Sequence, residues 1–167
     1  HENKFLLLYG KNEGLKNSTI NSVIKSNNNV YSYEEKDILD NQELFLENLF
    51  TKSLFEPEKV IIIKRATDKI LKVIDLLLEK EIEDTYIIIK ADNLDKKSKL
   101  RSFFEKSKQF LIIAFYPDTF DTLFKLANNF FKKKKISISN ENINLIISKC
   151  NNDREILLNE IEKIELF

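Results

Sequence analysis

Two glycines near the start of the chain stand where a phosphate-binding loop is expected. A loop that cradles nucleotide phosphates needs Gly, four residues, then Gly-Lys and Ser or Thr, because backbone amides surround the phosphates, the lysine reaches them and the hydroxyl holds magnesium. Here only three residues separate Gly10 from Gly14, and Leu15, Lys16 and Asn17 follow. We therefore expect a chain that neither binds nor hydrolyses ATP and uses no cofactor.

Side chains that support nucleophilic or metal catalysis are scarce. The chain has one histidine, His1, and one cysteine, Cys150. A Ser-His or Cys-His pair needs a histidine inside the fold, and a zinc site needs several Cys and His ligands. We expect no catalytic and no metal site, and therefore no enzyme. A single cysteine also allows no intrachain disulfide, which is typical of a cytoplasmic protein.

Basic residues gather in two places. Lys96, Lys97, Lys99 and Arg101 begin a predicted helix after Asp95. This cluster has two interpretations, a solvated helix face or a contact with DNA phosphates, which requires no special geometry. The second cluster, 132–135, closes another predicted helix, where lysines complement the helix dipole. We interpret it as a solvated helix end.

Two large apolar residues lie on a short connection. Ser53, Leu54 and Phe55 stand between a helical pattern and the strand-like run 60–63. Connections run over the surface and carry binding function on a rigid scaffold, so these residues are placed to enter a partner's pocket. Buried Leu and Phe are also the norm. The residues alone leave both roles open, a docking wedge or a plug of the domain's own core.

Strand-like apolar segments alternate with helical patterns over the first two thirds of the chain. The predicted strands are 5–9, 30–33, 60–64, 86–90 and 110–115, and the predicted helices are 15–25, 42–51, 68–79 and 95–106. Strands separated by helices require crossover connections and a parallel sheet. The pattern predicts a five-stranded α/β domain over residues 1–116.

The strand-like runs stop after Pro117. Three helical patterns follow, opened by Asp118 or Thr119, by Ser139 and by Asp153, each a favourable N-cap residue. Residues 117–167 are therefore expected to form a small three-helix domain.

Composition fits a globular protein. Of the 167 residues, 43% are apolar and 32% charged, with 27 basic and 27 acidic side chains. Because the charges balance, any contact with nucleic acid must come from a local patch. The sequence has no apolar run near 18 residues and no signal-peptide pattern. We expect a cytoplasmic protein that does not contact a membrane.

The order and spacing of several segments resemble the delta subunit of the bacterial DNA polymerase III clamp loader. The segments that carry the resemblance are Phe5 to Gly10, Ser53-Leu54-Phe55 with Val60 to Arg65, Ala91 to Lys97, Ile136 to Ser139, and Asn151 to Arg154 with the residues up to Leu166. This similarity extends over the whole chain. Phe50 departs from it, since some family members have glutamine at this position, and the family's C-terminal collar domain has no counterpart here.

The resemblance implies an AAA+-like fold without ATP binding, followed by a helical lid. It implies that Ser53, Leu54 and Phe55 dock on the sliding clamp (beta subunit) and favour its opening during replication. Further partners that it implies are the gamma/tau and delta prime subunits and primed DNA. Two other functions remain: a degenerate P-loop-like domain that binds nucleic acid or a nucleotide through Lys96 to Arg101, and a structural module that binds a protein partner.

Overall fold

The structure is a computed structural model that describes residues 4–26, 28–51, 58–80, 82 and 84–165. Its contacts divide the chain into two compact units. The sheet unit holds residues 1–11 and 18–115, and the helical unit holds residues 12–17 and 116–167. The helical unit is therefore built from two separate stretches of chain.

The sheet unit contains a five-stranded sheet in which every described pairing is parallel. Its strands are β1 (Phe5–Tyr9), β2 (Asn29–Glu34), β3 (Lys59–Ala66), β4 (Thr85–Ala91) and β5 (Leu111–Ala114). They lie in the order β2-β3-β4-β1-β5. The central strands β1, β3 and β4 are continuous apolar runs because both of their faces are covered. The predicted α/β class is confirmed.

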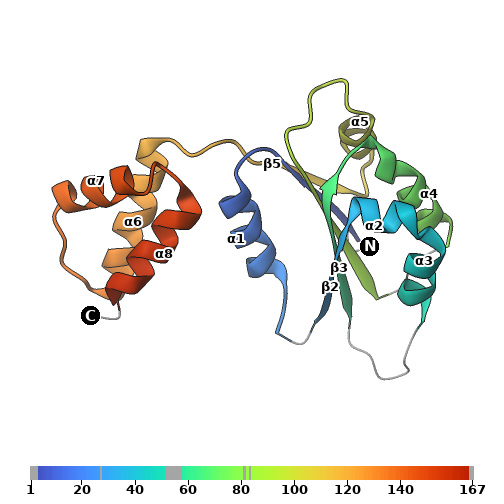
Figure 1. Ribbon diagram of the computed structural model, residues 1–167, viewed down its shortest axis with the longest axis horizontal. Helices are drawn as coiled ribbons and strands as arrows, with labels where there is room; N and C mark the ends of the chain where they lie inside the picture. Colours follow the sequence, from blue (N-terminus) through green and yellow to red (C-terminus); the bar gives the residue numbers. More distant parts are fainter. Residues whose placement is uncertain (1–3, 27, 52–57, 81, 83, 166–167) are drawn as a thin grey trace. The chain divides into compact units, whose positions relative to one another are not determined.

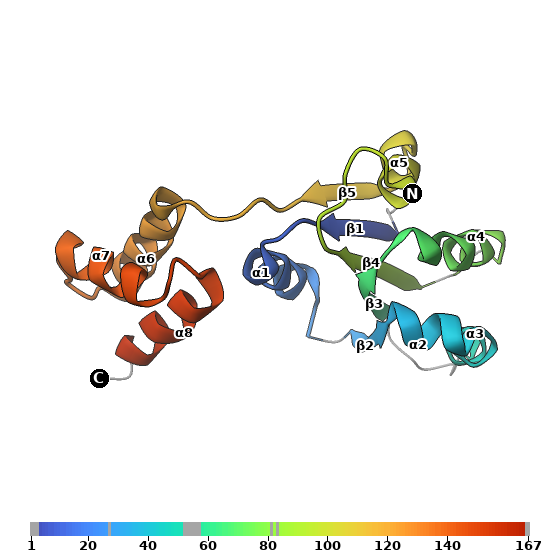
Figure 2. The same ribbon diagram turned by 45° about the horizontal axis from the view of Figure 1, so that its top comes forward.

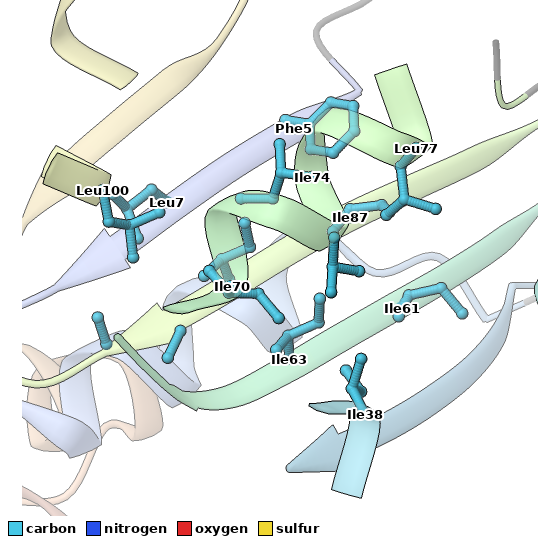
Figure 3. Packing of buried hydrophobic residues seen from close by; sticks show 14 of the residues in the cluster. Phe5, Leu7, Ile38, Ile61, Ile63, Ile70, Ile74, Leu77, Ile87 and Leu100 are labelled. Atoms are coloured by element: carbon cyan, nitrogen blue, oxygen red, sulfur yellow. The ribbon is translucent and has the colours of Figure 1, made fainter. Parts of the chain in front are cut away.

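Helices cover both faces of this sheet. They are α1 (Glu13–Val23), α2 (Glu35–Asp40), α3 (Gln42–Phe50), the 3-10 turn η1 (Asp68–Ile70), α4 (Leu71–Glu79) and α5 (Lys99–Lys106). Helix α1 lies on one face and α2 to α5 on the other (Figures 1 and 2). The main core lies between the sheet and helices α2 to α5, where Ile38, Ile74 and Leu100 pack against Leu7 and Ile61 (Figure 3).

Two elements differ from the sequence prediction. Helix α5 begins at Lys99 and not after Asp95, because the Asp95 carboxylate accepts the N–H groups of Lys97 and Ser98 and closes a turn. The helix then starts with the Ser98 hydroxyl accepting the N–H of Arg101. Helix α2, which the sequence did not predict, connects β2 to α3.

The helical unit contains α6 (Phe120–Lys134), α7 (Asn140–Lys149) and α8 (Arg154–Glu165). The expected caps are present: Thr119 forms a capping box with Thr122, Ser139 caps α7, and Asp153 accepts the N–H of Ile156. Apolar residues of the three helices, together with Cys150, form a separate core. Three helices are what the sequence predicted for this part of the chain. No helix within the described ranges is long and apolar enough to cross a membrane.

Candidate functional site

The predicted docking residues Ser53, Leu54 and Phe55 lie outside the described residues, but both ends of their segment are described. Thr51 is the C-cap of α3, with extended backbone, and Lys59 opens β3. Lys59 is only 8% exposed, and its side-chain ammonium donates to the carbonyl oxygen of Thr51 over 2.8 Å. The ammonium group of this buried residue thus links the end of α3 to the start of β3, and this link fixes the distance between the two ends of the intervening segment.

An open depression of about 580 Å³ lies between α3 and the C-terminal end of α4. Its lining is Glu43, Leu46, Glu47 and Phe50 of the helix together with Lys80. Phe50 is 37% exposed, and the Lys80 ammonium lies 5.1 Å from its ring centroid, a cation–π contact. Phe50 immediately precedes Thr51, so an apolar side chain is on the surface directly beside the proposed docking segment.

The predicted basic cluster divides into two parts. Lys96 and Lys97 are exposed in the turn before α5, and Lys99 is exposed at its first position. The Arg101 guanidinium instead contacts Glu105 Oε1 at 2.7 Å and the Leu94 carbonyl oxygen at 3.1 Å, and lies 5.2 Å from the Tyr9 ring. Three lysines are therefore presented together, whereas Arg101 is engaged by its own domain.

The turn before α5 is held by carboxylates. Asp68 of η1 accepts hydrogen bonds from the N–H groups of Leu100 and Lys99 and from the Ser98 hydroxyl. These bonds, from Leu100 first and then Lys99, lower the pKa of Asp68 below its ordinary value. The carboxylates near the lysines thus bind backbone donors of the turn, and among the described residues no salt bridge involves Lys96, Lys97 or Lys99.

Gly10, the first of the two glycines near the start of the chain, is required by the fold. Gly10, at the end of β1, has φ 117°, and a Cβ atom there would lie 2.1 Å from the Phe115 carbonyl oxygen. In the helical unit, Asn12 caps α1 by accepting the Leu15 N–H at 3.0 Å. Glu13 pairs with Lys16, whose side chain is buried. No group of three potential metal ligands occurs in the part of the chain that the structure describes.

A buried polar cluster in the helical unit was not predicted from the sequence. Asp118 receives the Arg154 guanidinium through Nε at 2.7 Å and Nη2 at 2.6 Å. It also accepts Asn12 Nδ2 at 2.7 Å and the Thr122 hydroxyl at 2.8 Å. Asn12 and Asp118 are 106 positions apart. No local pattern could have indicated this contact.

Comparison with solved structures finds a likeness of fold. The Bacillus subtilis DNA clamp loader delta protein (YqeN) matches 99% of this chain with a TM-score of 0.63 at 17% sequence identity. The match covers 54% of that protein, so this chain spans about half of its length. No family model and no curated protein matches the sequence. The likeness at this identity is one of fold.

Proposed function

We propose that this chain acts as the clamp-contacting part of a delta-type clamp-loader subunit. The observation that carries the proposal is the fold shared with the B. subtilis clamp loader delta protein over nearly the whole chain. The sequence resemblance to delta subunits, with Ser53, Leu54 and Phe55 on the connection from α3 to β3, supports the same role.

Leu54 and Phe55 act as an apolar wedge that enters a hydrophobic pocket of the sliding clamp. The bond from Lys59 to Thr51 supports this role, because a segment with fixed ends loses less conformational entropy on binding than a free one. Phe50, exposed beside Thr51, extends the apolar surface next to the wedge.

The wedge opens the clamp by binding preferentially to its open conformation. A ligand shifts a two-state equilibrium only by its difference in affinity for the two states, so the wedge must bind the open ring more tightly than the closed ring. This step breaks no covalent bond and uses no ATP. In this proposal ATP is used by other subunits of the loader, the partners are the gamma/tau and delta prime subunits, and primed DNA enters the assembled complex.

The decisive experiment combines a binding and a stability measurement on Leu54→Ala/Phe55→Ala. Central apolar anchors of an interface typically contribute about 2 to 4 kcal/mol each. We expect clamp affinity to fall at least roughly a hundredfold, equivalent to about 2.7 kcal/mol, with thermal unfolding little changed.

The matched control is Leu145→Ala/Ile156→Ala, which removes two apolar side chains that are 53% and 46% exposed in the helical unit. This control should bind the clamp like the wild type. If the wedge variant loses about 5 kcal/mol of stability, its residues belong to the domain core and the proposal fails.

A second contact, with the DNA backbone, is proposed for Lys96, Lys97 and Lys99. The observation in its favour is that these three lysines are exposed at the start of α5 and form no salt bridge with another described residue. Arg101 was predicted to share this role, but its guanidinium bonds within its own domain, so we assign it to holding the turn through the Leu94 carbonyl.

Joint change of Lys96, Lys97 and Lys99 to Ala should weaken DNA binding by the assembled loader and reduce its salt dependence. Each lost phosphate contact lowers the slope of log K against log salt by about 0.9. The triple change of Lys132, Lys133 and Lys134, also exposed, is the control. Equal salt slopes for the two triple variants would exclude this contact.

A further inference from the structure

We propose that Asp118 is an internal anion that clasps the start of α1 to the helical unit. The clasp consists of Asn12, Asp118 and Arg154, with Thr122 as an additional donor. It holds residues 12–17, which residues 18–115 separate from the rest of that unit in the sequence. This inference rests on described contacts and does not depend on clamp binding.

The carboxylate of Asp118 has a full set of partners. Oδ1 accepts Arg154 Nη2 and the Thr122 hydroxyl, and Oδ2 accepts Arg154 Nε and Asn12 Nδ2, all within 2.8 Å. The side chains of Asp118 and Arg154 are only 6% and 13% exposed. A bidentate pair of this kind is strongest when water is excluded, and removal of one partner leaves an uncompensated buried charge.

The hydrogen bonds keep this anion charged. Burial alone would raise the pKa of Asp118, but the bonds from Arg154, Thr122 and Asn12 outweigh it and lower the pKa below its ordinary value. The carboxylate therefore stays ionised well below neutral pH.

Asn12 connects the Asp118 carboxylate to α1 because the nitrogen and the oxygen of its side-chain amide both form hydrogen bonds. Its Nδ2 donates to Asp118 and, at 3.0 Å, to the Tyr116 carbonyl oxygen, while its Oδ1 accepts the Leu15 N–H. One side chain is thus both the N-cap of α1 and a ligand of the buried carboxylate. The aliphatic part of Arg154 packs over Gly14, where an added Cβ would lie 3.4 Å from three of its carbons.

The test separates clasping from capping with one substitution, Asn12→Asp. Aspartate is as good an N-cap as asparagine, so the cap of α1 survives. A second carboxylate would then lie opposite Asp118, where like charges repel. Hydrogen exchange of the full chain should show the amides of residues 13–17 exchanging at least roughly tenfold faster.

Two further variants complete the design. Asn12→Asp/Asp118→Asn exchanges the roles of carboxylate and amide, and it should restore much of the protection because one anion again faces Arg154. Asn21→Ala, on an exposed position of the same helix, should leave exchange of residues 13–17 unchanged. The proposal is overturned if Asn12→Asp exchanges like the wild type, if β3 and β4 lose protection equally, or if the double variant is no better than Asn12→Asp.

Discussion

Gly10 and Gly14 are close in sequence but are needed to different degrees. At Gly10 the backbone has φ 117°, which side chains with a Cβ rarely adopt, and the Phe115 carbonyl oxygen occupies the place of a Cβ. At Gly14, within α1, an added Cβ would meet the Arg154 side chain at 3.4 Å. The first glycine is required by the close approach of two backbones, and the second only borders a side chain.

Gly10→Ala is expected to lower the free energy of unfolding by about 2 to 4 kcal/mol, because strain of the backbone adds to a clash. Gly14→Ala should change it by no more than about 1 kcal/mol, since helix propensity favours alanine. Urea unfolding of both variants measures the difference. Similar losses in the two variants would contradict this assignment.

At the scale of elements, the connection from α3 to β3 depends on the amine of Lys59. Lys59→Met keeps the aliphatic stem and removes the bond to the Thr51 carbonyl oxygen. We expect a loss of about 1 kcal/mol in stability, the usual contribution of one hydrogen bond. Clamp affinity should also fall roughly fivefold, because the described ends of the segment, Thr51 and Lys59, would no longer be linked before binding.

Lys72→Met is the matched control, since Lys72 is exposed on α4. It should alter neither quantity. A Lys59→Met chain that loses stability but binds the clamp normally would show that the bond from Lys59 to Thr51 stabilises the fold without contributing to clamp binding.

The elements also show how far the sequence predicts local structure. All five strands occur close to the predicted runs. For β1, β3 and β4 the reason is that strands buried on both faces require continuous apolar residues. The sequence prediction placed the start of α5 too early, because an aspartate such as Asp95 suits a turn as well as it suits a helix N-cap. Helix α2 was missed because, besides Glu35, only Ile38 of its six residues is buried, too little for a helical period.

At the scale of the whole molecule, the α/β class was predictable and the clasp was not. A continuous run of apolar residues indicates a buried segment, and such a run can be recognised from neighbouring residues in the sequence. The contact between Asn12, Asp118 and Arg154 joins side chains that no spacing rule connects. Ser53, Leu54 and Phe55 lie outside the described residues, so their role stays a prediction from resemblance and from the ends of their segment.

We expect that Mg-ATP does not change the thermal stability of the chain. A ligand at a hundred times its dissociation constant stabilises a protein by about 2.7 kcal/mol, which would raise the Tm by roughly 5 to 10 °C at this size. We expect no shift at about 1 mM Mg-ATP, because only three residues separate Gly10 from Gly14 and the required Lys-Ser/Thr is missing. A clear rise in Tm would contradict this expectation.

The division of the chain has a consequence for experiments that cut the protein into pieces. The backbone passes between the two units three times, at 11/12, 17/18 and 115/116. A fragment that starts at Tyr116 would lack residues 12–17 and, with them, the amide that Asp118 accepts. The helical unit thus cannot be excised or transplanted at a single boundary. A protease cut near Pro117 would leave its two stretches joined only by non-covalent contacts such as the bond from Asn12 to Asp118.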